Sequence, residues 1–404
     1  VFFDAEFPRV DRDAGSYAAI QEIRMFQALG CKVTFVPTNM AYLGRHTAYL
    51  QRLGVETIHT PFYPDITTFL RDRGSEFDLA YITRYGAARQ VLGQLADFAP
   101  QARTVINVAD LHFLRQIRDA MVAKDSTSLD MAMETRDTEI SVLSGAELVL
   151  SYSAIEQAVI TSHIAKGPKT GLLPWVIDPR PLKAPFGKRR DIAFLGGFSH
   201  TPNIAAVRFF ADEVMPLLRV ALPGIRFLVY GSAVPPEVET LASDDVIIKG
   251  YVKDVSEVFD SCRVFVAPLL SGAGMKGKVL DCIAAGIPSV LSPIAAEGIG
   301  LRDGFDTIIA VKPEEWVQGI MKLYNGEAAW NTMSKHLLEL AANRFSFETG
   351  VANLREALAA IEFYLPGNAP ALHATSARPI PPRYLPESVM GGKIVSALPS
   401  GRQQ

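Results

Sequence analysis

Glycines and lysines are concentrated in one segment of the sequence, just after a short apolar run. Gly272, Gly274 and Gly277 fall in a predicted loop between a strand and a helix that begins near Gly277. Glycines let backbone N–H groups approach a ligand closely, and a helix N-terminus adds unpaired donors and a partial positive charge. Because Lys276 and Lys278 add two full charges at the same place, the segment predicts an anion site suited to a diphosphate.

An acidic residue, Asp281, follows one turn into the same predicted helix. Its carboxylate would point back toward a ligand above the helix, and the paired hydroxyls of a ribose are its natural partners. The alternative interpretation of the whole segment is a flexible surface turn with ordinary solvated lysines. Taken alone, a single acid in a helix predicts no particular chemistry.

A second group of polar residues follows a predicted strand at residues 104–108. Asp110 and His112 come directly after it, at the edge of a parallel sheet where ligands bind. The alternative is an acid that caps the next helix and a histidine that is packed or exposed. Ser153 and Glu156 follow another predicted strand, and we interpret them mainly as a helix capping box.

Other kinds of chemistry find no support in the sequence. The other histidines have no metal-ligand spacing, no serine occupies a nucleophile elbow, and no lysine ends a phosphate loop of the Walker type. Cys31, Cys262 and Cys282 are too few and too scattered for a disulfide framework or a zinc site, so we interpret them as core residues in a reducing compartment. We therefore expect no metal and no bound cofactor.

Strands and helices that alternate along the chain must position these residues. Between the strands, apolar residues recur at helical spacing, as at Ile20 and Ile23, and Gly30 and Gly54 stand where helices should end. Such alternation predicts an α/β fold with parallel sheets covered on both faces. The predicted strands are residues 1–3, 32–36, 55–58, 79–83, 104–108, 148–151, 192–195, 226–229, 246–248, 264–267, 289–291 and 307–311.

The strand–helix pattern stops at a proline-rich basic stretch and then restarts, which predicts two Rossmann-like domains facing each other across a cleft. Lys188, Arg189 and Arg190 in the stretch could touch an anionic membrane surface, but a solvated connection between domains is the favoured interpretation. The predicted parts are an N-terminal domain at 1–177, a linker at 178–190, a C-terminal domain at 191–346, a helix across the domain junction at 347–365, and an extended proline-rich tail at 366–404.

Composition limits the classes of protein that the chain could be. It has 404 residues, 49% of them apolar, and 40 Lys and Arg against 43 Asp and Glu give a net charge of −3. This balance argues against a nucleic-acid binder, and the longest apolar stretch is too interrupted to cross a membrane. Since the sequence has no initiator Met and starts at Val1 inside a predicted strand, we expect that it is part of a longer polypeptide. The acids Asp4 and Glu6 so near the start argue against a signal peptide.

At several places the sequence resembles the GT-B-fold glycosyltransferases, specifically the retaining nucleotide-sugar enzymes of glycosyltransferase family 4. The resemblance covers about residues 1 to 364, and its motifs are weak singly but strong in this order and spacing. They are Asp11-Arg-Asp-Ala-Gly-Ser16, Leu173-Pro-Trp-Val-Ile-Asp178, Phe194-Leu-Gly-Gly-Phe-Ser-His-Thr-Pro-Asn203, Gly272-Ala-Gly-Met-Lys-Gly-Lys-Val-Leu-Asp281, Ala285-Gly-Ile-Pro288 and Glu297-Gly298.

The resemblance implies donor-binding roles for residues of both domains. In the family, backbone N–H groups at the positions of Met275, Lys276 and Gly277 face the sugar and phosphate, an acid at the position of Asp281 holds the ribose, and a histidine at the position of His112 meets the donor sugar. The implied donor-binding set is Gly15, Ser16, Gly196, Gly197, Gly274, Met275, Lys276, Gly277, Lys278 and Asp281, with His112 and Asp110 as the implied catalytic residues.

This sequence departs from the family pattern at three positions. Ala273 stands where the family has a glutamate that contacts the sugar, and Gly197 and Asn203 stand where many members place an arginine and a lysine on the diphosphate. A diphosphate in a poorly hydrated cleft needs cationic partners. We therefore hypothesise that Lys276 and Lys278 replace the missing pair.

The Asp11 and Asp13 pair resembles an Asp-x-Asp metal motif, but transferases with that motif use a different single-domain fold. We interpret these acids as helix caps or as part of the acceptor side. The resemblance therefore implies no metal. If the reaction inverted the sugar, it would need a protein base, for which Asp110 and His112 are the candidates.

The function expected from the resemblance is transfer of a sugar from a UDP- or GDP-linked donor to a hydroxyl of a glycan or lipid-linked acceptor, with retention. We expect the protein in the cytoplasm or at the inner face of the membrane, with a role in polysaccharide biosynthesis. Two alternatives are a sugar-nucleotide epimerase, which needs no acceptor, and a degenerate nucleotide-sugar-binding module of a larger protein, which releases no nucleoside diphosphate.

Overall fold

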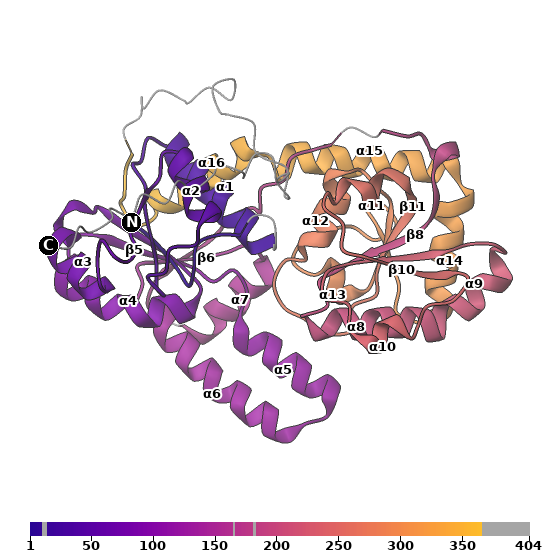
Figure 1. The fold of residues 1–404 in the computed structure, drawn as a ribbon, viewed down its shortest axis with the longest axis horizontal. Helices are drawn as coiled ribbons and strands as arrows, with labels where there is room; N and C mark the ends of the chain where they lie inside the picture. The colour runs from indigo at the N-terminus through magenta and orange to yellow at the C-terminus, as the bar shows by residue number, and fades with distance from the viewer. Residues whose placement is uncertain (10–13, 165, 181–182, 366–404) are drawn as a thin grey trace, which may run out of the picture.

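Two parallel sheets, each covered by helices, form the two domains (Figure 1). The computed structural model describes residues 1–9, 14–164, 166–180 and 183–365. Within these residues the N-terminal sheet has seven strands in the order β3-β2-β1-β4-β5-β6-β7, and the C-terminal sheet has six in the order β10-β9-β8-β11-β12-β13. Neighbouring strands pair in parallel in both sheets, which confirms the α/β, GT-B-like architecture expected from the sequence.

The N-terminal sheet consists of β1 Phe2–Asp4, β2 Thr34–Pro37, β3 Glu56–Thr57, β4 Leu79–Thr83, β5 Arg103–Asn107, β6 Leu148–Ser151 and β7 Lys169–Leu172. Its helices are α1 Ala14–Ala28, α2 Arg45–Arg52, α3 Ile66–Arg73, α4 Tyr85–Phe98, α5 His112–Ala123, α6 Ser126–Leu143 and α7 Ala154–His163. The central strands are buried on both faces, which is why they read as continuous apolar runs.

The C-terminal sheet consists of β8 Arg190–Leu195, β9 Phe227–Tyr230, β10 Val246–Gly250, β11 Cys262–Ala267, β12 Ser289–Leu291 and β13 Ile308–Ile309. Its helices are α8 Thr201–Phe209, α9 Met215–Ala221, α10 Pro236–Glu239, α11 Ser256–Ser261, α12 Gly277–Ala284, α13 Pro293–Ala296, α14 Pro313–Asn325 and α15 Glu327–Arg344, with a π-helical turn at Phe210–Val214. Every strand predicted from the sequence is present, with ends that differ by a few residues.

One strand was not predicted. β7 lies at the edge of the N-terminal sheet, and its residues are partly exposed. Its sequence Lys-Thr-Gly-Leu has neither an apolar run nor an apolar–polar alternation. An edge strand needs only one partner, here β6, so it carries little of the pattern by which buried strands are recognised.

The chain returns to the N-terminal domain after α15. Helix α16, Phe347–Ala359, packs on α1, and a side chain at Gly350 would come within 2.6 Å of the sulfur of Met25. Figure 1 shows α15 and α16 as consecutive helices over the two domains. The helix is shorter than the expected 347–365, and the tail at 366–404 lies outside the described residues.

The expectation of a solvated basic linker is wrong for Arg189. This residue is 1% exposed, and its guanidinium donates to the backbone oxygens of Ala184, Phe259 and Cys262. Burial lowers the pKa of Arg189. Its two neighbours, Lys188 and Arg190, are exposed as expected. Arg189 therefore anchors the entry to β8 and is not available to a membrane surface.

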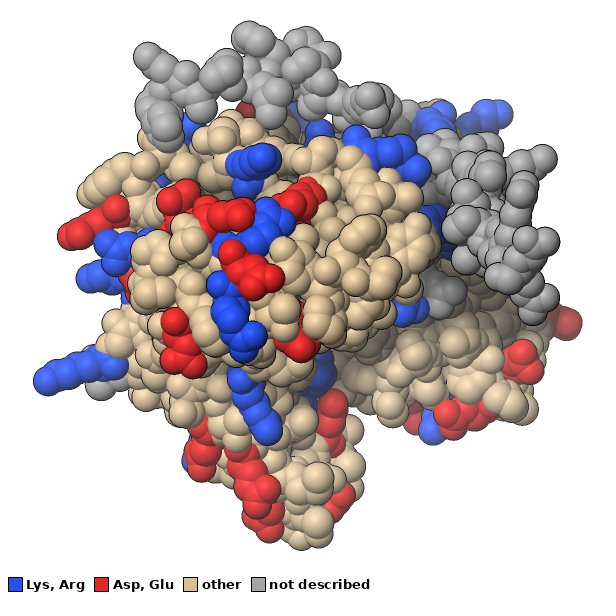
Figure 2. All heavy atoms as spheres, turned by 60° about the vertical axis from the view of Figure 1, so that its left-hand side comes forward, with Lys and Arg blue, Asp and Glu red and all other residues tan. Residues whose placement is uncertain are grey.

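Helices α5 and α6 project from the N-terminal domain as a pair (Figure 1). On the face shown in Figure 2, Lys and Arg lie among Asp and Glu, and neither sign forms a continuous field. None of the described helices is long and apolar enough to cross a membrane.

Candidate active site

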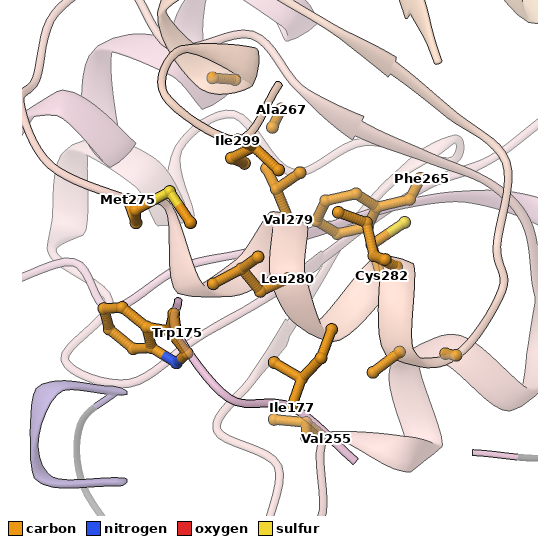
Figure 3. Close-up of a cluster of buried hydrophobic side chains, with 14 of the residues drawn as sticks. Trp175, Ile177, Val255, Phe265, Ala267, Met275, Val279, Leu280, Cys282 and Ile299 are labelled. Atoms are coloured by element: carbon orange, nitrogen blue, oxygen red, sulfur yellow. The ribbon is translucent and has the colours of Figure 1, made fainter. Parts of the chain in front are cut away.

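The predicted donor loop connects β11 to α12 at the carboxyl edge of the C-terminal sheet. Gly272 and Gly274 have φ angles of +137° and +69°, which favour glycine. Met275 is buried and lies beside the first turn of α12 in the apolar cluster of Figure 3, which includes Trp175 and Leu280. The core therefore holds the loop in place through Met275.

Lys278 lies beside the glycine turn that follows β8. Its ammonium group donates to the side-chain oxygen of Asn203 and lies 4.4 Å from the centre of the Phe194 ring. A side chain at Gly196 would come within 2.8 Å of the Lys278 nitrogen, so glycine at this position makes room for the amine. Asn203 also donates to the backbone oxygen of Gly197 at 2.6 Å. The structure thus brings Gly196, Gly197 and Lys278 together, as expected.

The Lys278 amine is poorly solvated. Burial, together with the nearby positive charge of Lys276, lowers its pKa to about 7. Its described hydrogen-bond partner, the Asn203 amide, carries no charge. A partly buried cation next to a neutral partner gains free energy from a bound anion, because the anion replaces the hydration that was lost.

Lys276 points to different partners. Its ammonium donates to the backbone oxygen of Gly274 at 2.7 Å, and the residue is 8% exposed. Burial lowers its pKa to about 8, against the opposing effect of the carboxylates of Glu297 and Glu156. Lys276 therefore stabilises its own loop and faces acids near the domain boundary, whereas Lys278 faces the glycine turn.

The N-terminal half of the site is built at the end of β5. Asn107 accepts a hydrogen bond from the backbone N–H of Ala109 at 3.0 Å and donates to the buried Glu22 at 2.6 Å. Ala109 has a φ of +59°, a conformation that this side-chain bond supports. The turn presents Asp110 to the other domain, where a side chain at Gly274 would come within 2.8 Å of it. Glycine at 274 therefore permits close contact between the two predicted halves of the site.

Asp110 is paired and His112 is uncharged. The Asp110 carboxylate accepts a hydrogen bond from Arg115, and its other oxygen lies 3.6 Å from Nε2 of His112. The His112 ring packs edge to face on Tyr85 with 5.0 Å between ring centres. Burial lowers the pKa of His112 despite the nearby Asp110 carboxylate, so the ring is neutral at pH 7 and can exchange hydrogen bonds with sugar hydroxyls.

Two buried glutamates hold this region in place. Glu139 of α6 accepts from the backbone N–H groups of His112 at 3.2 Å and Phe113 at 3.0 Å, and so caps α5. Glu156 of α7 accepts from the N–H groups of Leu111 at 3.0 Å and Gly274 at 3.1 Å with one oxygen. Burial raises the pKa of each carboxyl to about 7.

The interpretation of Ser153 and Glu156 as a capping box is half correct. Ser153 caps α7 by accepting from the backbone N–H of Glu156. The Glu156 side chain does not return to the cap, because it bonds Leu111 and Gly274 as described above. The Ser153 N–H donates to Ser151 instead. Glu156 thus connects the two domains through hydrogen bonds, and we call such a contact a joint. The sequence pattern did not indicate it.

A second joint lies between the projecting helix α5 and the C-terminal domain. Arg118 donates two hydrogen bonds to Glu297, at 2.6 and 2.7 Å, and a third to the backbone oxygen of Gly272 at 2.8 Å. Next to it, a side chain at Gly298 would come within 2.4 Å of the Ser153 hydroxyl. These contacts bring the carboxyl edges of the two sheets together around the site.

The remaining predicted residues lie on the same edges. Gly15 and Ser16 are in the first turn of α1, where the Ser16 hydroxyl accepts from the backbone N–H of Arg9 at 2.8 Å. Gly277 begins α12, and Asp281 is buried in it at 6% exposure. Asp11 and Asp13 lie outside the described residues. In the part of the chain that the structure describes, no group of three or more His, Cys, Asp or Glu residues is arranged to hold a metal ion.

Arg84 is a candidate site residue that the sequence did not single out. It follows β4 next to β1, where the strand order of the sheet reverses, and ligands bind at such switch points. Its guanidinium donates to both carboxylate oxygens of Asp4, at 2.8 and 3.1 Å. Its φ of +70° is unusual for arginine and marks a tight turn after the strand. The signal available in the sequence was only its place after a predicted strand.

Comparisons with known proteins show which sequences this chain resembles. Residues 189–326 match the family model described as "Glycosyl transferases group 1". An uncharacterized 44.6 kDa protein of the cps region of Klebsiella pneumoniae is 23% identical over 188 residues, so the match spans 43% of this chain and about half, 47%, of that protein.

Solved structures are similar over most of the chain. Sucrose-phosphate synthase from Thermosynechococcus elongatus has a TM-score of 0.69 at 14% identity, covering 88% of this chain and 96% of its own. Anabaena HepE, solved in complex with UDP-glucose, has a TM-score of 0.64 at 13% identity, covering 89% and 98%. The chain therefore has the GT-B fold of glycosyltransferases, and its C-terminal domain matches the group 1 glycosyltransferase family.

Proposed function

We propose that this chain transfers a sugar from a nucleoside diphosphate sugar to a hydroxyl of a glycan or lipid-linked acceptor, with retention of configuration. The observation that carries the proposal is the Lys278 amine, which lies under the Gly196–Gly197 turn beside the N-terminus of α12. A cation, a helix N-terminus and glycine-rich backbone at one place form a site for a diphosphate.

We hypothesised that Lys276 and Lys278 replace the arginine and lysine that many family members place on the diphosphate. The position of Lys278 supports this hypothesis for Lys278. The family lysine is implied at position 203, where this chain has asparagine. The Lys278 nitrogen is hydrogen-bonded to that Asn203 side chain, so a cation reaches the same place from α12. Lys276, bonded to Gly274, supports the loop backbone instead and would act on the diphosphate at longer range.

The remaining donor contacts that we propose come from the end of this loop and from the first two turns of α12. The backbone N–H groups of Met275, Lys276 and Gly277 would face the sugar and phosphate, and Asp281 would hold the ribose. UDP is the first nucleotide to test, because the similar HepE was solved in complexes with UDP, with UDP and glucose, and with UDP-glucose. The proposal needs no metal ion.

We take retention from the family resemblance. An inverting transfer would need a protein base beside the acceptor hydroxyl. Asp110 is ion-paired with Arg115 and is a weak candidate for that base, so His112, with its lowered pKa, is the base that the inverting alternative would use. In a retaining transfer the leaving diphosphate can accept the acceptor proton on the same face. Catalysis then rests on orientation and on stabilisation of the charge that develops on the diphosphate, the task we assign to Lys278 and α12.

Thermal unfolding with UDP, GDP, ADP and TDP tests nucleotide binding first. A ligand at one hundred times its dissociation constant adds about 2.7 kcal/mol to the free energy of unfolding, so one nucleotide should raise the melting temperature clearly. No shift with any of them would contradict the proposal.

Product analysis then separates the remaining alternatives. With a glycan or lipid-linked acceptor extract, we expect release of nucleoside diphosphate and an α- or β-linkage of the same configuration as the donor, read by NMR. Conversion of the donor without acceptor would indicate an epimerase. Binding with no diphosphate release would indicate a nucleotide-sugar-binding module. We place the activity in the cytoplasm or at the inner face of the membrane, as part of the same proposal.

A further inference from the structure

Two exposed aromatic rings flank a buried histidine on the N-terminal domain, away from the donor loop. Tyr42 is 49% exposed and Phe62 is 73% exposed, while His59 between them is 5% exposed. The ring centres of Tyr42 and His59 are 5.0 Å apart, and those of His59 and Phe62 are 5.3 Å apart. We call Tyr42 and Phe62 the aromatic pair.

The loops that carry the aromatic pair are tied to each other. The backbone N–H and the hydroxyl of Thr60 donate to the backbone oxygen of Met40 at 2.9 and 3.1 Å. The His59 ring contacts the Thr60 backbone oxygen at 2.6 Å through Nδ1 and packs edge to face on the buried Phe7. These contacts connect the two loops that carry the exposed rings. Because the loops do not move independently, less conformational entropy is lost when a ligand binds.

The aromatic pair lies on the same sheet edge as the candidate active site. Tyr42 follows β2 and Phe62 follows β3, and the carboxyl ends of parallel strands share one edge. The loop after β2 is also tied to the end of β1, since the Thr38 N–H donates to the Asp4 backbone oxygen at 2.7 Å. β2 and β3 are three and four strands from β5, which places the pair about 14 to 19 Å along the edge from Asp110.

We propose that the aromatic pair is an acceptor subsite that stacks on a sugar ring of a glycan, a few rings away from the hydroxyl that receives the new sugar. Flat aromatic rings with polar surroundings suit sugar rings, which present C–H groups on their faces and hydroxyls at their edges. In the same two loops the exposed residues include the polar Asn39, Thr60 and Asp65 as well as the small apolar Ala41, Pro61 and Pro64. A charged pair, Glu6 with Arg9, lies in the neighbouring loop after β1. These features favour a hydrated glycan over a lipid chain. The inference rests on the proposed function and names its acceptor as an oligosaccharide.

Ligand-observed NMR with defined hexose and N-acetylhexosamine oligosaccharides of one to six rings, in the presence of UDP, tests the inference. We expect that longer oligosaccharides bind more tightly than single sugars. The double variant Tyr42→Ala with Phe62→Ala should lose this gain, by about tenfold in affinity. Tyr42→Phe and Phe62→Tyr should retain it, because they keep the rings. Tyr364→Ala removes another ring that is 76% exposed and serves as the matched control.

The outcomes separate this inference from the proposed function. If the double variant binds long oligosaccharides as the wild type does, or if no oligosaccharide binds, the subsite is refuted. Melting shifts with UDP and slow hydrolysis of the donor without acceptor should be the same in all variants, and their absence in the wild type would refute the proposed function instead. A loss of sedimentation with phosphatidylglycerol vesicles, in place of a loss of glycan binding, would identify a membrane contact and overturn the glycan assignment.

Discussion

The two sheets share the same order over their first six strands, yet the charged side chains at their carboxyl edges have different partners. At the C-terminal edge, Lys278 has a neutral hydrogen-bond partner and lies between a glycine turn and a helix N-terminus. Among the described residues of the N-terminal edge, the carboxylates of Asp4 and Asp110 are ion-paired, with Arg84 and Arg115. Under the proposed function, the C-terminal edge binds the anionic diphosphate and the N-terminal edge binds an uncharged ligand rich in hydroxyls. Topology supplies the position of a site, while charge pairing decides what it binds.

The largest effect should come from removing the cation of the donor edge. Lys278→Met keeps the buried stem but loses the ammonium group, so we expect about a 30- to 100-fold lower affinity for the nucleotide sugar. Isothermal titration calorimetry checks the value. Lys188→Met, which removes an exposed lysine of the same domain that precedes β8 and so lies at the opposite edge of the sheet, should leave the affinity unchanged. If both variants bound the nucleotide sugar as tightly as the wild type does, Lys278 would not be the cation that binds the diphosphate, and the proposed difference between the two edges would be refuted.

The same amine should make donor binding depend on pH. The pKa of Lys278 is lowered to about 7 in the free protein, and a bound diphosphate favours the charged form, so binding takes up a proton. Affinity should therefore fall as pH rises through 7, by about tenfold between pH 6 and pH 8. A UDP-sugar is the ligand of choice, because its diphosphate does not titrate in this range. The Lys278→Met variant should show a weaker dependence, and an affinity that rises with pH would contradict the assignment.

The contact between the domains should have a smaller effect than the loss of the Lys278 cation. Arg118→Met and Glu297→Gln each break the two-bond ion pair across the domains. Because both side chains are about one-fifth exposed, the pair should contribute about 1.5 kcal/mol. A double-mutant cycle on the KM for the donor measures this coupling, and strictly additive effects would show that the joint does not act as a unit.

The smallest effect should be confined to the acceptor edge. Glu139→Ala removes the cap of α5 and should cost about 1 kcal/mol of stability, which lowers the melting temperature by about 2 to 4 °C. Nucleotide affinity should not change, since Glu139 belongs to the N-terminal domain. Calorimetric scanning with and without UDP gives both values in one experiment. A lost UDP response in this variant would mean that the edges are not independent.

The sequence predicted the fold well because its buried strands are continuous apolar runs separated by amphipathic helices. It also predicted a glycine-rich loop between a strand and a helix at residues 268–276, which the structure contains between β11 and α12. The role of this loop in donor binding stays a prediction. It failed to predict β7, whose edge position needs no such pattern.

Contacts between segments that are distant in the chain could not be predicted from the sequence. Glu156 has the spacing of a helix capping box and uses its carboxylate elsewhere, and Arg118 meets Glu297 across 179 residues of chain. The different directions of Lys276 and Lys278, two residues apart, depend on which partner each amine reaches in three dimensions. Local patterns specify elements and loops, whereas the choice of partners is made by packing.

A crystal structure of the protein with UDP tests the central claim most directly. We predict a diphosphate oxygen at about 2.7 to 3.2 Å from the Lys278 nitrogen, with the phosphates at the start of α12 and facing the Gly196–Gly197 turn. A diphosphate bound elsewhere, with Lys278 still donating to Asn203 alone, would contradict the account.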